Sequence, residues 1–158
     1  MQKISYTYCD SNVFLAYFNS EEGRIDILDQ LFEQVQNDNQ RKLVTSAFSI
    51  IEVAHVANEK QKFTLMPDVE EKFDVFWADT SLIELIDFHE NLARKARTLM
   101  RQATINKYSL QGVDALHIVS AQLVGVDKFF TYDIKLKKFE DMVGFSISEP
   151  HVDQPKLL

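Results

Sequence analysis

Four acidic residues stand in or beside apolar segments of the chain. Asp10 directly follows an apolar, aromatic run, Glu52 lies within an apolar helix-like segment, Asp114 begins another, and Asp133 comes just past an apolar strand. Clustered carboxylates repel one another and raise each other's pKa unless a cation neutralises them. Oxygen ligands of this kind suit Mg²⁺ or Mn²⁺ better than zinc, and such an ion activates water and stabilises charge developing on a phosphate. The four residues together therefore predict a metal-dependent nuclease site.

Each of the four carboxylates also has an ordinary structural explanation. Asp10, Asp114 and Asp133 stand where aspartate often serves as a helix cap or turn residue. Glu52 is harder to explain in this way, because residues 50–54 are mostly apolar and an unpaired buried carboxylate is costly. A partly exposed polar face of that helix would nevertheless accommodate it. The joint occurrence of the four residues, rather than any one of them, supports the prediction of a site.

Two carboxylate–histidine pairs indicate a rival metal chemistry. Glu52 with His55, and Asp114 with His117, are each spaced three residues apart on a predicted helix. Di-iron helix bundles use Glu-x-x-His pairs together with two further glutamates. Here one pair begins with aspartate and the chain contains strands, which argues against a di-iron bundle. The two histidines are interpreted as packing groups or as groups that support a neighbouring site.

Basic residues are locally concentrated although the chain is acidic overall. The sequence has 17 Lys and Arg against 24 Asp and Glu, a net charge of −7, which opposes tight non-specific binding of nucleic acid. Arg94, Arg97 and Arg101 share one predicted helix, and Lys135 stands close to Asp133. These side chains could hold phosphates, and the alternative is that they only form a solvated surface.

Strand-like and helix-like segments alternate along the chain, which predicts a parallel sheet covered on both faces. Strands are expected at residues 4–9, 42–45, 82–86, 128–131 and 145–148, and helices at 13–18, 24–37, 46–61, 67–77, 90–106, 114–124 and 134–142. Ser46 is the predicted cap of the third helix, and Gly125 the predicted stop after the helix at 114–124. In such folds ligands bind beyond the carboxyl ends of the strands, near the switch in strand order. Asp10 and Asp133 are therefore expected at that edge.

Length and composition place the chain among ordinary globular domains. The 158 residues are 46% hydrophobic and 26% charged, which suits one domain with a substantial core. The single cysteine, Cys9, excludes an internal disulfide and a multi-cysteine zinc site. No apolar run approaches the roughly 20 residues that cross a bilayer, and the N-terminus lacks the pattern of a signal peptide, so a cytoplasmic protein is expected. Residues 150–158 are expected to form a loosely held tail.

Four ordered blocks of the sequence resemble the PIN domain, the nuclease fold of VapC-type toxins. Residues 8–15 resemble its opening strand and Asp-x-Asn turn, and residues 44–53 its Ser-then-Glu helix. Residues 112–121 are similar to its most recognisable block, and residues 129–133 resemble its final Thr-x-Asp strand end. The resemblance implies a PIN-like nuclease domain over residues 1–149, folded as a three-layer α/β/α sandwich with a central, mostly parallel sheet.

The same resemblance implies an activity, a cofactor and partners. The activity is hydrolysis of RNA by an endoribonuclease that depends on Mg²⁺, with Mn²⁺ as a substitute. The implied catalytic and metal-binding quartet is Asp10, Glu52, Asp114 and Asp133, with Asp10 and Asp114 the expected direct ligands. Asn12, Ser46 and Thr131 are expected to orient carboxylates or water. The implied partners are an RNA substrate, an antitoxin protein and a second copy of the chain in a homodimer.

Two other functions fit part of the sequence. One is a PIN-like module that binds RNA or supports assembly without significant turnover, against which the complete quartet argues. The other is a phosphoryl-transfer or receiver-like α/β protein with an acidic pocket. Residues 10–12 lack the second aspartate of a phosphatase-type Asp-x-Asp-x-Thr loop, which weakens that alternative.

Overall fold

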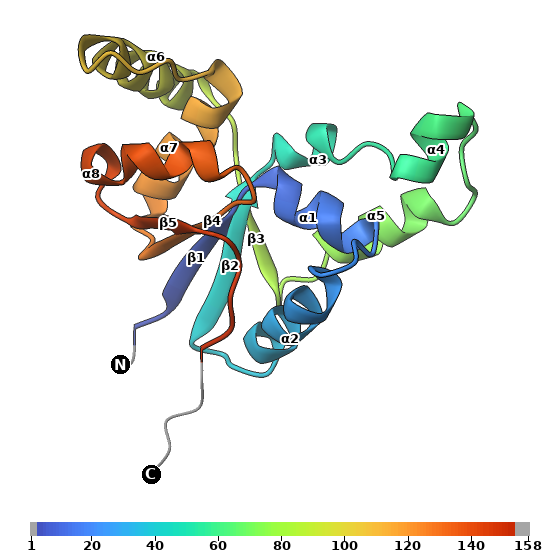
Figure 1. Ribbon diagram of the computed structural model, residues 1–158. Coiled ribbons are helices and arrows are strands. Elements are labelled where there is room, and N and C mark those ends of the chain that lie inside the picture. Colours follow the sequence, from blue (N-terminus) through green and yellow to red (C-terminus); the bar gives the residue numbers. More distant parts are fainter. Residues whose placement is uncertain (1–2, 154–158) are drawn as a thin grey trace.

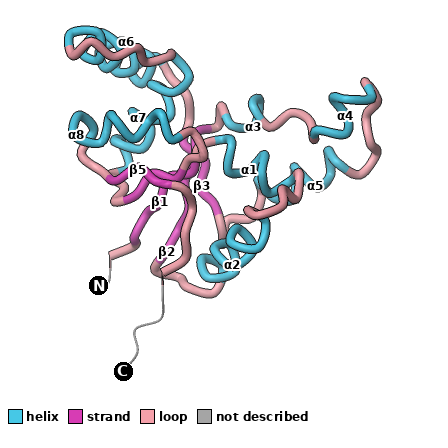
Figure 2. Tube along the Cα trace, in the orientation of Figure 1, coloured by secondary structure: helices cyan, strands magenta, loops and turns pink. Residues whose placement is uncertain are grey.

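A parallel sheet of five strands forms the centre of the molecule (Figures 1 and 2). The computed structural model describes residues 3–153. The sheet order is β3-β2-β1-β4-β5, and every neighbouring pair is parallel. The strands are β1 (Ser5–Cys9), β2 (Arg41–Ser46), β3 (Ile83–Ile86), β4 (Lys128–Phe130) and β5 (Ser146–Ser148). The alternating pattern of the sequence thus predicted both the strands and their parallel arrangement.

Helices cover both faces of this sheet, which gives the predicted three layers (Figure 1). One face carries α1 (Ser11–Phe18), α2 (Ile25–Gln36) and α5 (Val69–Trp77). The other carries α6 (Glu90–Ile105), α7 (Gly112–Val124), the 3₁₀ segment η1 (Ile134–Phe139) and α8 (Glu140–Val143). The short helices α3 (Ser49–Glu52) and α4 (Ala57–Lys62) connect β2 to α5. None of the helices in the described part of the chain is long and apolar enough to cross a membrane.

Helix periodicity explains the position of each helix in its layer. In α6 the buried residues Leu92, Ala96, Leu99 and Ala103 recur on one stripe, and its charged residues face solvent. In α7, by contrast, every residue from Ala115 to Ala121 is buried. A helix buried on all sides must have neighbours on all sides. Accordingly α7 lies between the sheet and α6, and its first turn is held at the edge of the sheet.

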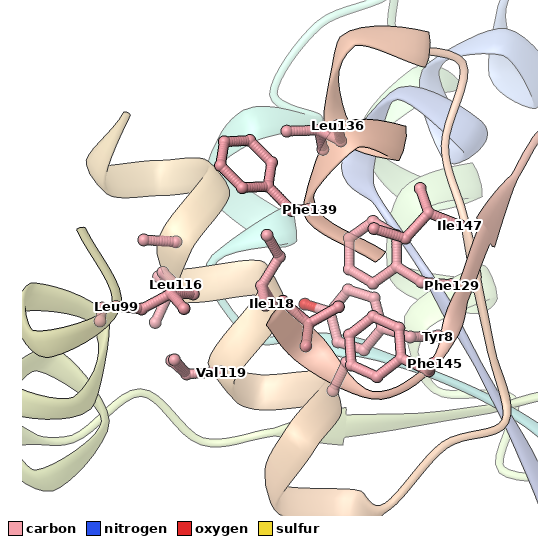
Figure 3. Packing of buried hydrophobic residues seen from close by; sticks show 14 of the residues in the cluster. Tyr8, Leu99, Leu116, Ile118, Val119, Phe129, Leu136, Phe139, Phe145 and Ile147 are labelled. Carbon is pink, nitrogen blue, oxygen red and sulfur yellow. The ribbon is translucent and has the colours of Figure 1, made fainter. Parts of the chain in front are cut away.

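The hydrophobic core consists of one cluster on each face of the sheet, because successive strand residues point to opposite faces. Tyr8 belongs to the cluster beneath α6 and α7, whereas Cys9 belongs to the cluster beneath α1, α2 and α5. In the first cluster the rings of Tyr8 and Phe129 stack with centroids 5.0 Å apart, and Phe129 stacks on Phe145 at 5.7 Å (Figure 3). This stack fixes the Tyr8 ring within a closely packed layer.

The helix predicted over residues 46–61 is wrong as a single element. The structure divides it into α3 and α4, with a break after Glu52 where Val53 leaves the helical region at φ −102° and ψ 54°. The buried Glu59 accounts for the second start, because its carboxylate accepts hydrogen bonds from the backbone N–H groups of Val56 at 3.1 Å and Met66 at 2.8 Å. A carboxylate that reaches back to the residue before a helix stabilises a new N-terminus there.

The prediction for residues 134–142 and the predicted helix cap at Ser46 also differ from the structure. The single helix expected over residues 134–142 is a 3₁₀ segment followed by α8, which ends at Gly144 with φ 88°. The Ser46 hydroxyl accepts a hydrogen bond from the N–H of Phe48 at 3.1 Å, but α3 begins only at Ser49. Gly125 ends α7 in the left-handed conformation, as predicted.

Candidate metal centre at the carboxyl edge of the sheet

The order of the strands brings the four carboxylates to one edge of the sheet. β1 and β4 are neighbours, but the chain leaves β1 toward β2 and returns to β4 on the other side. Asp10 directly follows β1, and Asp133 follows β4 after a short turn. Asp114 lies in the first turn of α7, the helix that leads into β4, and Glu52 ends α3 after β2. This is the switch point at which open α/β sheets bind ligands.

Asp10 is the most deeply embedded carboxylate of the four, with only 5% of its surface exposed. Its Oδ1 accepts a hydrogen bond from the N–H of Ser11 at 2.8 Å. Its Oδ2 accepts one from the Thr131 hydroxyl at 2.9 Å and one from the Asn12 amide at 3.3 Å. Burial raises the pKa of Asp10 more than His117 and the hydrogen bonds from Thr131 and Ser11 lower it. Asp10 is also the N-cap of α1, so its capping role and its place at the site coexist.

Asn12 and Thr131 tie the ends of β1 and β4 together. The Asn12 amide nitrogen donates to the Thr131 hydroxyl at 2.9 Å, and its amide oxygen accepts from the N–H of Tyr132 at 3.0 Å. The Thr131 hydroxyl also accepts from the N–H of Asp133 at 3.0 Å. Asp133 in turn caps η1 by accepting from the N–H of Lys135 at 3.1 Å. The predicted orienting residues Asn12 and Thr131 therefore contact Asp10, and Thr131 also holds the backbone of Asp133.

A buried histidine joins Glu52 to Asp10. The Nε2 atom of His117 lies 2.6 Å from Oε1 of Glu52 and 3.5 Å from Oδ1 of Asp10. Its Nδ1 lies 2.6 Å from the Tyr8 hydroxyl. Burial lowers the pKa of His117, but the hydrogen bond to Glu52 and the charges of Asp10 and Asp114 outweigh burial, so the pKa is raised overall. The interpretation of His117 as a group that supports the site agrees with this geometry.

Asp114 titrates under the influence of the other three carboxylates. Burial raises its pKa first, the charges of Asp10, Asp133 and Glu52 raise it further, and His117 partly offsets them, with a result of about 6. The interpretation of Asp114 as a helix cap is wrong, because Gln111 is the N-cap of α7 and Asp114 lies inside its first turn. The charges of Asp10, Asp133 and Glu52 all act on Asp114, so the four carboxylates form one electrostatic unit.

The chemistry of this unit fits a divalent cation with oxygen ligands. Asp10, Glu52, Asp114 and Asp133 supply only carboxylate oxygens, the ligand type that Mg²⁺ and Mn²⁺ prefer. Within residues 3–153, however, no group of three or more His, Cys, Asp or Glu side chains already has the geometry of a metal site.

Ser46 is connected to the site through its backbone and not, as predicted, through its side chain. Its hydroxyl bonds to the N–H of Phe48, and among the hydrogen bonds of the described residues none joins it to the four carboxylates. Its backbone N–H donates to the Tyr8 hydroxyl at 3.0 Å, which connects it to His117. Reasoning from the sequence did not identify Tyr8. The available signal was a hydroxyl in a strand predicted to be buried, since a buried tyrosine hydroxyl needs a partner.

The predicted phosphate-binding cations lie on the surface of the molecule. Arg94, Arg97 and Arg101 are exposed along α6, and Arg94 forms an ion pair with Glu90 at 3.1 Å. Lys135 is exposed next to Asp133. A further cation was not predicted: the guanidinium carbon of Arg24 lies 3.9 Å above the ring of Tyr132, the residue before Asp133. Of the predicted phosphate-binding cations, Lys135 lies nearest in the chain to a member of the quartet, two residues after Asp133.

A comparison with protein families decides where the chain belongs. The family model described as PIN domain matches residues 7–142, which include all four carboxylates and the strands β2, β3 and β4. The chain belongs to the PIN domain family. No curated protein sequence matches this PIN domain.

Several solved structures have a fold similar to that of this chain. VapBC2 from Rickettsia felis, solved with a DNA fragment from its promoter, matches with a TM-score of 0.65 and 17% identity over 91% of this chain and 97% of that one. FitAcB from Neisseria gonorrhoeae matches with a TM-score of 0.62 and 17% identity over 91% and 97%. VapC20 of Mycobacterium tuberculosis, described as a toxin that cleaves the sarcin-ricin loop, matches with a TM-score of 0.61 and 12% identity over 88% of this chain and 95% of that one. At these identities the likeness establishes the fold.

Proposed function

We propose that this PIN domain is a Mg²⁺-dependent endoribonuclease that acts as the toxin of a toxin–antitoxin pair. The proposal is carried mainly by the gathering of four carboxylates at the switch point of the sheet, where burial and the charges of the other three raise the pKa of Asp114. Asp10 and Asp114 would hold the cation, with Glu52 and Asp133 completing its surroundings. A bound Mg²⁺ or Mn²⁺ would activate water and offset charge developing on the phosphate.

The protein's own residues have separate tasks in this proposal. Ser11, Asn12 and Thr131 fix the direction of the Asp10 carboxylate through three hydrogen bonds, so that it does not have to reorganise when a cation arrives. Lys135, next to Asp133, and the exposed arginines of α6 would position the RNA backbone. Base contacts are not needed for this step, since phosphate contacts alone set the register of the strand.

The first prediction tests the proposed chemistry. Asp10→Asn and Asp114→Asn should each lower the rate of RNA cleavage by at least about 100-fold, because each removes a negative oxygen ligand. The assay uses a fluorophore–quencher RNA with added Mg²⁺ or Mn²⁺, and far-UV circular dichroism checks the fold. The matched control is Asp26→Asn, which changes an exposed aspartate of α2 and should cleave at the normal rate. Full activity of either site variant, or of the natural sequence in excess EDTA, would contradict the proposal.

An RNA-binding module without turnover is the second candidate. It is favoured by one observation, the lack of a ready metal geometry among the side chains of residues 3–153. The fluorophore–quencher RNA of the first prediction distinguishes the nuclease from the binding module. Saturable binding by fluorescence anisotropy, with no cleavage at any concentration of Mg²⁺ or Mn²⁺, would support the binding module.

An antitoxin partner is proposed for the groove between α2 and α5. The groove has a volume of about 750 Å³ and an aromatic floor that includes Tyr17, Phe18, Phe32 and Phe76. Five acidic residues also line it, namely Asp29, Glu33, Asp68, Glu71 and Asp79. Lys72 is the one cation among the described residues that line the groove, and it pairs with Asp68 at 3.0 Å. An apolar floor with an acidic rim complements a basic, amphipathic segment of a partner.

The second prediction tests this groove. The double variant Glu33→Lys and Glu71→Lys should weaken capture of a co-expressed antitoxin, encoded by the adjacent reading frame, by at least about 10-fold. Glu70→Lys is the control, since Glu70 is exposed on the same helix but does not line the groove. Equal capture by both variants would place the partner elsewhere. The homodimer stays a prediction, to be checked by light scattering against the chain mass of 18.3 kDa.

A further inference from the structure

The imidazole of His117 is fully buried and bonded at both nitrogens. On one side it contacts the Tyr8 hydroxyl, and on the other it faces two members of the acidic quartet. Tyr8 cannot easily move, because its ring is stacked on Phe129 within the packed layer shown in Figure 3. The proposed function assigns no task to either residue.

The hydrogen bonds around Tyr8 favour one of the two positions for the hydrogen on the His117 ring. The backbone N–H of Ser46 donates to the Tyr8 hydroxyl oxygen at 3.0 Å, so that oxygen acts as an acceptor there. The phenolic hydrogen is then shared between two acceptors, Nδ1 of His117 at 2.6 Å and the Thr45 hydroxyl, and the short distance favours Nδ1. A neutral imidazole that accepts at Nδ1 carries its hydrogen on Nε2. A protonated imidazole carries a hydrogen on Nε2 as well, so in both cases Nε2 is a donor.

The N–H group at Nε2 makes its shorter contact with Glu52 and a longer one with Asp10. It lies 2.6 Å from Glu52 Oε1 and 3.5 Å from Asp10 Oδ1. Asp10 keeps three other hydrogen-bond donors, whereas within residues 3–153 His117 is the sole hydrogen-bond partner of the Glu52 carboxylate. Glu52 also ends a helix of only four residues that is followed by a break. Its side chain therefore depends on His117 for its direction.

We propose that His117 is a positioning residue of the acidic quartet: Tyr8 keeps a hydrogen on Nε2, and that N–H holds Glu52 beside Asp10. The consequence for cation binding rests on the proposed function, but the hydrogen-bonded chain from Ser46 through Tyr8 and His117 to Glu52 belongs to the protein alone. A hydrogen bond that orients a metal-binding side chain commonly changes metal affinity by about 10- to 100-fold when it is removed.

The tautomer of His117 provides the first test. Nitrogen-15 NMR of the histidine ring, recorded without metal at a pH where the ring is neutral, should show the hydrogen on Nε2. Tyr8→Phe removes the phenolic donor and should raise the fraction of the Nδ1–H tautomer above that of the natural sequence, although the Glu52 carboxylate continues to favour a hydrogen on Nε2. Tyr6→Phe is the matched control, because Tyr6 lies on the same strand and its hydroxyl makes no hydrogen bond within the described residues. A hydrogen on Nδ1 in the natural sequence, or an unchanged tautomer in Tyr8→Phe, would overturn the proposal.

Binding of Mn²⁺, measured by calorimetry, provides the second test. His117→Leu should weaken binding by at least about 10-fold, and His117→Gln, which keeps an N–H donor at similar reach, should weaken it less. In a Glu52→Gln background, His117→Leu should add little, since residues that act through one another are not additive. Full additivity, or equal affinity of the natural sequence and His117→Leu, would overturn the proposal. If His117→Leu does not fold, the comparison of Tyr8→Phe with Tyr6→Phe decides in the same assay.

The two tests separate this inference from the proposed function. If the natural sequence neither binds Mn²⁺ nor cleaves RNA, the proposed function fails, and the NMR comparison alone decides whether Tyr8 and His117 form the positioning chain. If the natural sequence binds Mn²⁺ and cleaves RNA but Tyr8→Phe behaves as Tyr6→Phe does, the proposed function stands and the inference fails.

Discussion

At the scale of single residues, the site is defined by titratable groups held close together. The charges of three other carboxylates act on Asp114, and the imidazole of His117 faces Glu52 and Asp10. The carboxylates raise the pKa of His117, and His117 partly offsets the repulsion that raises the pKa of Asp114. Protonation of either residue therefore relieves the same repulsion, which makes the stability of the metal-free protein depend on pH.

The third prediction concerns that pH dependence. Asp114 has a pKa of about 6 in the folded protein against 3.8 as its ordinary value, so the folded state binds the proton more tightly. The free energy of unfolding should therefore fall as pH rises from about 4 to about 6. The raised pKa of His117 has the same effect at higher pH. Its contribution to the free energy of unfolding is fully present below about pH 6.5 and is lost as the pH rises through the pKa of His117 in the folded protein.

Urea denaturation in EDTA at several pH values measures this effect. The decrease in the free energy of unfolding between about pH 4 and pH 6 should be smaller in Asp114→Asn, which cannot ionise, than in the natural sequence. Asp26→Asn serves again as the control and should follow the natural sequence. Parallel curves for Asp114→Asn and the natural sequence would show that Asp114 ionises normally.

At the scale of single elements, the ends of the helices decide where the functional side chains stand. α7 carries Asp114 in its first turn and His117 one turn later, so the position of this helix along its axis matters for both. Its start lies at the edge of the sheet, and its other end is closed by Gly125 in the left-handed conformation. The same conformation at Gly144 ends α8.

The fourth prediction tests the end of α7. Gly125→Ala should destabilise the protein by about 1 kcal/mol, because φ is +78° and a side chain is strained there. Gly112→Ala is the matched control at the other end of the helix, where φ is ordinary and a methyl group meets open space. That variant should stay within about 0.5 kcal/mol of the natural sequence. Equal urea midpoints for the two variants would show that Gly125 adopts another conformation.

At the scale of the whole molecule, the two hydrophobic clusters share one sheet. Adjacent residues of the same strand, such as Tyr8 and Cys9 or Phe129 and Phe130, belong to opposite clusters. Loss of the helices on one face would expose the apolar strand residues on that face and weaken the sheet that supports the cluster on the other face. Unfolding should therefore be cooperative, as expected for a single domain of this size.

The fifth prediction tests this coupling with two probes. Trp77, the only tryptophan, packs against the cluster of α1, α2 and α5, and its ring lies 5.1 Å from that of Phe14. Far-UV circular dichroism also reports α6 and α7 on the opposite face. Urea midpoints from tryptophan fluorescence and from circular dichroism should coincide. Separate midpoints would indicate that the two layers unfold independently.

The sequence by itself determined the features that depend on local pattern. The alternation of strands and helices predicted the parallel three-layer fold, and the positions of Asp10 and Asp133 after strands predicted that both lie at the carboxyl edge of the sheet. Gly125 marked the end of α7, because the left-handed conformation favours glycine. These features could be predicted because periodicity and helix-end chemistry act between residues that are close in the chain.

The tertiary structure alone decided the features that depend on distant contacts. Glu59 bonds to backbone groups on both sides of α4 and divides the helix that the local pattern predicted. His117 meets Tyr8 across 109 positions and Glu52 across 65, so these bonds depend on the order of the strands and the rotation of α7. Hydrogen bonds of this kind require two side chains to meet within a few tenths of an ångström. Such precision is set by packing, and no local pattern of residue types specifies it.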